Sequence, residues 1–359
     1  MEFIELAELC DKGSSNLAQK DLVFDSGIYP VYGAPGEITK VDFFHQSKPY
    51  LGLIKDGAGV GRVMKLPADS SVIGTIQYIF PKENVDLKYL YYLIKYLDLG
   101  KSNTGATIPH IYFKDYKKRK VKVREYGEQK HIGQILELID SHLSAYKTVL
   151  EQYDLLIKSR FVELFGDVVL NTLNWPLVKL SAIAEYRIGL TYKPEAVSSS
   201  GIAVLRSGNI QNSQLCYEDT IYVNSKVEPK LLLKKNDILM CARNGSQSLV
   251  GKVALIENDI SNTTYGAFMM AISSKYYVYL FEYFRSQAFR RLISVGSTTT
   301  INQVTTRMLN SIVIPLPDLD TINRFALYHS QINKLKSDVQ KSIDETQLLM
   351  DSLMQEYFG

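Results

Sequence analysis

Residues 128–166 read EQKHIGQILELIDSHLSAYKTVLEQYDLLIKSRFVELFG. Apolar side chains recur in this stretch at alternating intervals of four and three residues, which is the spacing of a coiled-coil seam. The members of this seam are Ile132, Leu136, Ile139, Leu143, Tyr146, Leu150, Tyr153 and Ile157. The pattern predicts a helix of roughly 35–40 residues and about 55 Å, far longer than the usual globular helix. Such a helix needs a partner that covers its apolar stripe.

The same pattern returns at the end of the chain. Residues 108–166 align with residues 301–359 without a gap, and both copies end in Glu-x-Phe-Gly. The second seam comprises Phe325, Tyr328, Ile332, Leu335, Val339, Ser342, Thr346, Leu349 and Leu353, with Ser342 and Thr346 as polar interruptions. We therefore predict two long helices that pack antiparallel as a coiled coil and act as a spacer.

The rest of the chain has a different character. It is richer in glycine, β-branched and aromatic residues, and short strand-like runs such as Tyr50–Ile54 and Asp237–Cys241 are broken by turns. Its two parts share a Ser-Gly-Ile stretch, a turn dipeptide and a Gly-basic-Val strand, in the same order. In the first part these are Ser26-Gly27-Ile28, Asp56-Gly57 and Gly61-Arg62-Val63. In the second part they are Ser200-Gly201-Ile202, Asn244-Gly245 and Gly251-Lys252-Val253.

These repeats predict an α+β fold with a pseudo-two-fold internal repeat. We expect globular α/β domains at residues 1–107 and 172–300. Repeat regions that carry the spacer helices are expected at residues 108–171 and 301–359. Two copies of one unit in tandem, with antiparallel helices, would be related by an approximate two-fold axis.

Composition narrows the class of protein. The chain has 359 residues, of which 46% are hydrophobic and 22% charged, as in a folded globular protein. No apolar run is long enough for a membrane span, and the opening MEFIELAELC lacks the basic region of a signal peptide, so a cytoplasmic protein is expected. The three cysteines, Cys10, Cys216 and Cys241, form no C-x-x-C pair, so we expect reduced thiols and no zinc site. A net charge of +3 neither requires nor excludes nucleic acid.

No known catalytic motif fits the sequence. Gly57-Ala58-Gly59-Val60-Gly61 follows a strand, but no helix follows it as a dinucleotide site requires. The segment from Gly245 to Lys252 has the wrong spacing for a phosphate-binding loop, and Val253 stands where Ser or Thr should hold magnesium. We therefore expect no catalytic residue, no metal and no cofactor on this chain. An enzyme without a known motif stays an open alternative.

The sequence indicates nucleic-acid binding more strongly than it indicates catalysis. Seven basic residues lie close together, interleaved with aromatics: Lys114, Lys117, Lys118, Arg119, Lys120, Lys122 and Arg124. Such a run can neutralise phosphates, although a solvated strand or an acidic partner would also explain it. The second repeat carries only Arg307 in its place.

Loop tips supply further candidates for DNA contact. Arginine and asparagine are shaped for bidentate hydrogen bonds with guanine and adenine edges, and backbone or hydroxyl donors suit phosphates. Each residue taken alone is more often an ordinary turn residue. The candidates are Lys55, Asp56, Gly57, Thr104, Gly105 and Thr107 in the first half, and Arg206, Ser207, Asn209, Arg243, Asn244, Thr298, Thr299 and Thr300 in the second.

The whole chain resembles the specificity (S) subunit of type I restriction–modification enzymes. The resemblance is strongest in Thr104-Gly105-Ala106-Thr107-Ile108-Pro109, in Glu128-Gln129, and in the long helix that ends Phe161-Val162-Glu163-Leu164-Phe165-Gly166-Asp167. Pro315-Leu316-Pro317 and Asn174-Trp175-Pro176-Leu177-Val178-Lys179-Leu180 also fit the family pattern. The second repeat departs from it, with Thr321-Ile322 where Glu-Gln is expected.

The resemblance implies a division of labour. Each globular domain would be a target-recognition domain, and together they would read a bipartite target in double-stranded DNA. The helices would dock two methyltransferase subunits, with a restriction subunit completing the complex. S-adenosylmethionine and ATP would be bound by those partners, and self-association of the isolated chain is left open. A coiled-coil scaffold without DNA, or a related methylation-only or type II-like system, are the alternatives.

Overall fold

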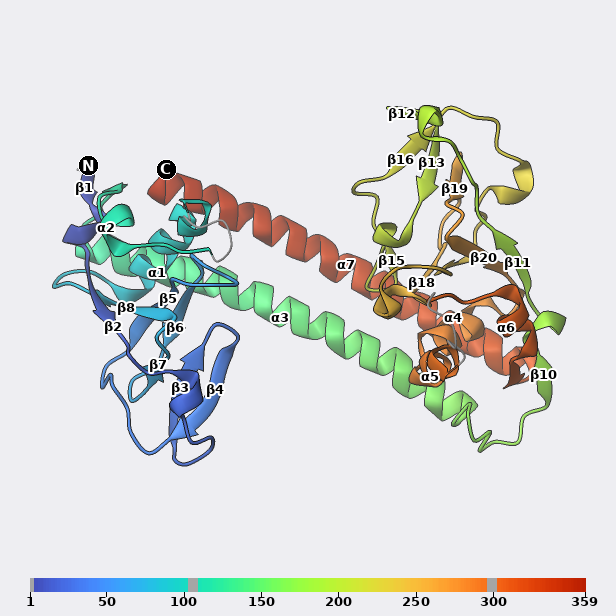
Figure 1. Ribbon diagram of the computed structural model, residues 1–359, viewed down its shortest axis with the longest axis horizontal. Coiled ribbons are helices and arrows are strands. Elements are labelled where there is room, and N and C mark those ends of the chain that lie inside the picture. Colours follow the sequence, from blue (N-terminus) through green and yellow to red (C-terminus); the bar gives the residue numbers. More distant parts are fainter. Residues whose placement is uncertain (1–2, 103–108, 296–301) are drawn as a thin grey trace. The chain divides into compact units, whose positions relative to one another are not determined.

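The computed structural model describes residues 3–102, 109–295 and 302–359. The chain divides into two compact units (Figure 1). Unit 1 comprises Met1–Val149 and Asp338–Gly359, and unit 2 comprises Leu150–Ser337. Helix α3, Tyr126–Phe165, and helix α7, Leu319–Phe358, are 40 residues each, which confirms the predicted lengths. Each unit takes a part of both helices.

The two long helices pack antiparallel within each unit. In unit 1, Leu136 and Leu143 of α3 share one core with Met350 and Phe358 of α7. In unit 2, the end of α3 shares a core with the beginning of α7: Ile157, Phe161, Phe165, Ile322, Phe325 and Ile332. The beginning of one helix thus meets the end of the other, as the seams predicted.

The register predicted for the second seam was partly wrong. Leu335 and Leu349 are 44% and 50% exposed, whereas Met350 is buried. The inward position beside Leu335 is taken by Lys336, whose Nζ lies 2.9 Å from Asp154 Oδ1 on α3. A paired lysine can occupy an interior position, so apolarity alone did not identify the buried face.

Unit 1 is built on an antiparallel sheet that helix α1, Leu87–Leu97, packs against. The sheet order is β2 (Cys10–Ser14), β8 (Ile76–Pro81), β5 (Tyr50–Ile54) and β6 (Val63–Leu66). The smaller sheets are β4 (Gly36–Val41), β3 (Tyr29–Gly33) and β7 (Ser71–Val72), and the pair β1 (Phe3–Glu5) with β9 (Lys120–Lys122). Strand β5 is buried along its whole length, which explains its continuous apolar sequence.

Unit 2 repeats this plan. Its antiparallel sheet has the order β11 (Glu185–Ile188), β20 (Met269–Ser273), β17 (Ile238–Cys241) and β18 (Val253–Leu255). The other sheets are β12 (Val197–Ser198), β16 (Ile221–Val223), β13 (Ile202–Leu205) and β19 (Thr263–Tyr265), the hairpin β14 (Ile210–Gln211) with β15 (Gln214–Leu215), and β10 (Leu177–Lys179) with β21 (Val313–Pro315). The shorter helices are α4 (Tyr277–Arg285), α5 (Gln287–Val295) and α6 (Thr306–Ser311), and unit 1 has α2 (Phe113–Tyr116).

The weak sequence likeness of the two halves thus corresponds to one shared topology. The parallel pair β3–β7 has its counterpart in β13–β19. The Gly-basic dipeptides directly precede β6 and β18, which hold matching places in the two sheets. The internal repeat predicted from the sequence is therefore a repeat of fold.

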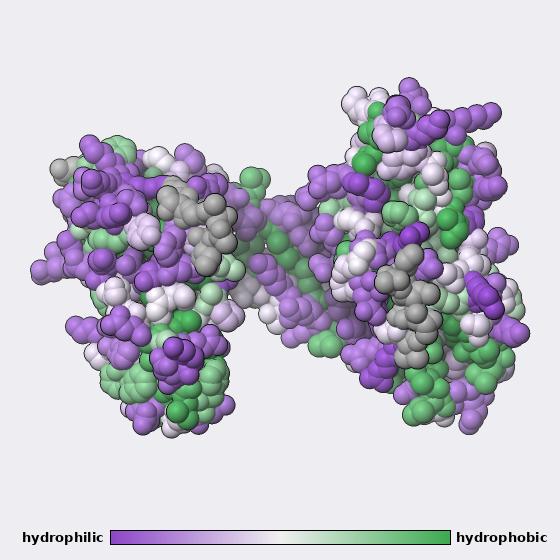
Figure 2. Space-filling model, in the orientation of Figure 1, coloured by the Kyte–Doolittle hydropathy of each residue, from purple (hydrophilic) through white to green (hydrophobic). Residues whose placement is uncertain are grey.

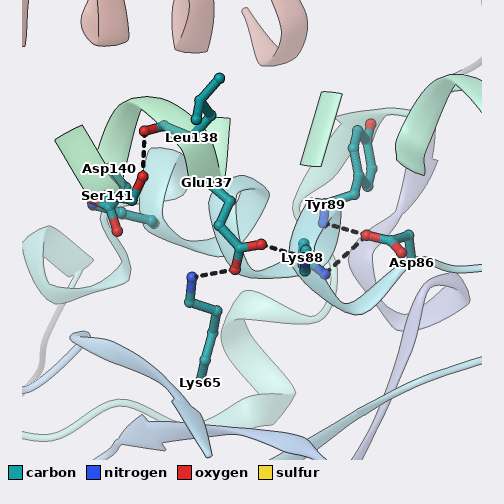
Figure 3. Close-up of polar contacts among 9 residues, drawn as sticks. Lys65, Asp86, Lys88, Tyr89, Glu137, Leu138, Asp140 and Ser141 are labelled. Atoms are coloured by element: carbon teal, nitrogen blue, oxygen red, sulfur yellow. Dashed lines mark hydrogen bonds and ion pairs between the residues drawn. The ribbon is translucent and has the colours of Figure 1, made fainter. Parts of the chain in front are cut away.

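Polar side chains fix α3 to the rest of unit 1 (Figure 3). Glu137 of α3 accepts a hydrogen bond from Lys65 Nζ of β6 at 3.0 Å and pairs with Lys88 of α1. Burial raises the pKa of Glu137, but the hydrogen bonds from Lys88 and Lys65 outweigh this effect, so that the pKa lies below its ordinary value. Asp86 caps α1 by accepting from the backbone of Lys88 and Tyr89.

The Glu-Gln motif has a structural role in the same region. Gln129 is 2% exposed. Its Oε1 accepts from the backbone N–H of Asp86 at 3.0 Å, and its Nε2 donates to the carbonyl of Arg124 at 2.8 Å. The matching residue in unit 2, Ile322, is buried in the apolar core. The departure of the second repeat from the family motif therefore exchanges a polar tie for apolar packing.

The described surface also carries apolar side chains. Figure 2 shows hydrophobic surface over the β3–β4 hairpin, and the exposed residues flanking that hairpin include Val23, Phe24 and Ile28. Across the described residues, no helix is both long enough and apolar enough to cross a membrane.

Candidate nucleic-acid interface

In each unit, the loop after the central strand meets the segment that follows a Thr- and Gly-bearing stretch. In unit 1, Gly57 N donates to Pro109 O and Ile111 N donates to Lys55 O, both at 3.0 Å. In unit 2, Asn244 N donates to Asn302 O at 3.4 Å and Val304 N donates to Ala242 O at 2.7 Å. The two units thus build this junction with the same hydrogen-bond pattern.

That pattern places Asp56 and Arg243 at equivalent backbone positions. Asp56 forms a β-bridge with His110, and Arg243 forms one with Gln303. His110 and Gln303 are matching positions in the gapless alignment of the two repeats. A carboxylate in one unit therefore stands where a guanidinium stands in the other.

Unit 2 has a cleft of about 940 Å³ at this junction. Three loops line it: Arg206–Gly208, Arg243–Gly245 and Gly266–Phe268. Asn244 Nδ2 donates to Ser207 Oγ at 3.1 Å, and the Phe268 carbonyl accepts from the backbone of Ala242 and Arg243. The other lining residues are Leu190, Thr191, Tyr192, Met269 and Asn302. Predicted residues from separate loops, Arg206, Ser207, Arg243 and Asn244, thus share one cleft.

The two cleft arginines differ in how free they are. The Arg206 guanidinium donates to Asp219 O at 3.1 Å. Arg243 is exposed, and its guanidinium carbon lies 5.4 Å from the centroid of the Phe268 ring. Arg243 therefore presents its donors to the cleft, while an aromatic ring supports its flat face.

Two predicted asparagines are occupied within the fold. Asn244 uses its oxygen to accept from Ser246 N at 2.9 Å and its amide to bond Ser207. Asn209 is 2% exposed, its oxygen accepts from Arg206 N, and its amide donates to the Cys216 and Glu218 carbonyls. The expectation that Asn209 reads a base is corrected, because burial leaves its amide only the role of holding the Arg206 loop.

Unit 1 presents a more neutral loop. Asp56 lies 3.9 Å from Lys55 Nζ and also pairs with His110. Gly57, Gly59 and Gly61 all have positive φ, so this glycine run forms tight turns. Lys55, Asp56 and Gly57 lie together at the junction, but the two charges partly neutralise each other.

The basic run is divided between fold and surface. The backbone carbonyls of Lys117 and Arg119 accept from Ala7 and Leu6. The Arg119 guanidinium donates to Leu97 O at 2.9 Å, at the end of α1. Arg124 pairs with Glu128 at 2.9 Å. Lys118 is exposed, so it stays a candidate for phosphate contact while Arg119 serves the fold.

Thr104, Gly105, Thr107, Thr298, Thr299 and Thr300 lie outside the described residues. Sequence reasoning missed Phe268, which is 61% exposed at the lip of the cleft. The only signal in the sequence was a large aromatic residue that directly follows Gly266-Ala267 in a turn.

Outside the junctions, the side chains with possible chemical reactivity include the cysteine thiols and the groups that could bind a metal ion. Burial raises the pKa of the Cys10 thiol to about 12 and also raises that of Cys241, so both stay protonated at neutral pH. Within the described ranges, no three His, Cys, Asp or Glu side chains come together as metal ligands would.

Comparison with known proteins agrees with this duplicated arrangement. A family model described as the type I restriction modification DNA specificity domain matches residues 1–152 and 173–350. The type I restriction enzyme MjaVIII specificity subunit of Methanocaldococcus jannaschii is 21% identical over 329 residues, 84% of this chain and 76% of that protein. The StySPI specificity subunit of Salmonella potsdam is 27% identical over 160 residues, which cover 41% of this chain and 33% of that protein.

A solved structure shares the fold. The type I restriction–modification system S subunit from M. genitalium superposes with a TM-score of 0.66 at 18% sequence identity. The match covers 100% of this chain and 96% of that chain. The α+β architecture with two long helices therefore also occurs in that solved structure.

Proposed function

The chain belongs to the family of type I restriction modification DNA specificity domains, and we propose that it selects the DNA target of a type I restriction–modification complex. Each unit reads one half of a bipartite target in double-stranded DNA. The observation that carries this proposal is the junction built twice with one hydrogen-bond pattern, with Asp56 in one unit and Arg243 in the other. Duplicated geometry with different chemistry is what two half-sites of different sequence require.

The contacts fall into two classes. Side chains that line the unit 2 cleft, above all Arg243, meet base edges in a groove of the duplex. Exposed lysines such as Lys118 contact phosphates, which gives affinity but little sequence preference. The Thr- and Gly-bearing stretches, which directly precede the junction residues in the sequence, add donors to phosphate oxygens.

Catalysis is assigned to partners. Two methyltransferase subunits dock on the helices and use S-adenosylmethionine, and a restriction subunit uses ATP. This chain contributes recognition and no catalytic group. In this proposal α3 and α7, which both units share, set the number of base pairs between the half-sites.

The first test is a map of methylated adenines in the host genome, with and without this gene. A bipartite motif that disappears on deletion supports the proposal and reveals the target. If no motif is lost, the next measurement is the binding of labelled duplex by the chain with its methyltransferase partner, which distinguishes a specificity subunit from a scaffold. Absence of sequence-selective binding there would leave a scaffold, and DNA modification by the chain alone would indicate an enzyme.

A second test addresses spacing. Insertion of four residues into both helices at matching positions lengthens each by about 6 Å, which is about two base pairs of DNA. The gap in the methylated motif should lengthen by about one or two base pairs while both half-sites keep their sequences. A changed half-site, or an unchanged gap in an active complex, would rule out the spacer role.

A further inference from the structure

Resting on the proposed function, we propose that Arg243 determines a guanine in the half-site of unit 2 and that Phe268 is the residue that positions it. Arg243 is exposed in the cleft. Among the described residues, neither a carboxylate nor a carbonyl accepts a hydrogen bond from its guanidinium. An arginine carries donors only, and the O6 and N7 atoms of guanine are the paired acceptors that match its fork.

Phe268 is placed to organise that arginine. Its carbonyl accepts from Ala242 N at 2.9 Å and from Arg243 N at 3.0 Å, so its backbone is held against the end of β17. Its ring is 61% exposed and lies 5.4 Å from the guanidinium carbon. A ring against the guanidinium face restricts the rotamers of the arginine and leaves the N–H groups at the guanidinium edge free.

In the other unit both the arginine and the aromatic ring are replaced. In unit 1, Thr75 occupies the position of Phe268, because its carbonyl accepts from Lys55 N as that of Phe268 accepts from Ala242 N. The partner position there carries Asp56. An aromatic ring thus accompanies the arginine, and a small polar residue accompanies the aspartate.

The same comparison argues for a base and against a phosphate as the contact. A position that faces the phosphate backbone disfavours a carboxylate, even one that Lys55 partly neutralises, since like charges repel. A position that faces base edges accepts either sign, because guanine offers acceptors whereas cytosine offers a donor amine. Arg243 and Asp56 at one backbone position therefore indicate a place where bases are read.

The test uses the complete methyltransferase complex and a set of duplexes with every base of the half-site replaced in turn. Arg243→Ala should lower the preference for guanine at one position by about 5- to 150-fold and leave the other half-site unchanged. Arg243→Lys should lose most of the same preference, because the charge remains but the fork does not. Phe268→Leu should lower the preference for guanine at that same position by about two- to five-fold. Phe268→Tyr should retain the preference.

The control is Arg291→Ala, which removes an exposed arginine of the same unit that does not line the cleft. It should leave the base preference unchanged. A wild-type half-site without guanine overturns the proposal. So does an Arg243→Ala variant that loses methylation equally on all duplexes with a reduced salt dependence, as a phosphate contact predicts. If the wild-type complex selects no sequence at all, the proposed function itself fails.

Discussion

Asp56 and Arg243 hold the same backbone position in the two units, each bridged to a matching residue of the internal repeat, His110 or Gln303. The main-chain hydrogen bonds on either side are also equivalent. Duplication has thus preserved the frame of the junction while the side chain changed from acceptor to donor. In the proposed function, the half-sites read by the two units can differ in sequence because the frame does not depend on these side chains.

Asp56→Asn should change the half-site read by unit 1 and leave the other unchanged. A carboxylate only accepts hydrogen bonds, whereas an amide also donates, so the base preferred at one position should shift or broaden. The ion pair with Lys55 is partly exposed, so its loss should cost less than about 1 kcal/mol of stability. The methylated motif of the variant gives the answer, and a change in both half-sites would contradict it.

Phe325→Ala should destabilise unit 2 by about 3–5 kcal/mol. The ring centroid of Phe325 lies 5.6 Å from that of Phe161 and 5.2 Å from that of Phe165, and its side chain is fully buried. Urea unfolding followed by the fluorescence of Trp175, the single tryptophan, reports on unit 2. The control Leu327→Ala, at a position 69% exposed on the same helix, should change the unfolding free energy by less than about 0.5 kcal/mol.

Glu282 should make the stability of unit 2 depend on pH. Burial raises the pKa of Glu282, but hydrogen bonds with His329 and Arg285 outweigh burial, and the net pKa lies below the ordinary value of 4.5. A lowered pKa stabilises the fold above the ordinary value, and that contribution is lost as the pH falls through the folded-state pKa.

Glu282→Gln removes the carboxylate that lies 2.6 Å from half-buried Arg285, which keeps Asp154 at 3.5 Å as its remaining partner. The variant should be about 1–3 kcal/mol less stable at neutral pH and should lose less stability on acidification. Urea midpoints from Trp175 fluorescence across an acid series measure both effects. Wild-type and variant curves that stay parallel throughout would show that Glu282 has no such linkage.

Gly61→Ala should lower the stability of unit 1 more than Gly251→Ala lowers the stability of unit 2. The two glycines match, since each donates its N–H at 2.8 Å to the central strand, and φ is +85 and +77. An added Cβ would lie 2.1 Å from the backbone N of Gly100 at position 61, but 2.6 Å from the side-chain tip of Ile293 at position 251. Both variants carry about 1–2 kcal/mol of left-handed strain.

Hydrogen exchange resolved to each unit measures the two costs. The excess for Gly61→Ala should appear in unit 1, because backbone cannot move aside as a side chain can. Equal losses of protection would mean that the Gly100 segment gives way without strain.

Local periodicity was enough to predict the repeat and both helices, because coiled-coil spacing persists over 40 residues in each. It was also enough for β5 and β17, whose short apolar runs end at glycine-bearing turns. The buried face of α7 could not be predicted from periodicity alone. Lys336 lies inward and Leu335 outward because Asp154, distant in sequence, supplies the partner for the charge.

The sequence by itself determined the candidate loops, since arginine, asparagine and glycine at turns carry a chemical meaning wherever they occur. Only the tertiary structure decided which of those side chains are free. Asn209 and Asn244 are held by bonds within the loops, whereas Arg243 is left with an aromatic support that comes from a different turn. A hydrogen-bond donor is available to DNA only if no closer acceptor in the fold satisfies it, and that depends on contacts between segments far apart in the chain.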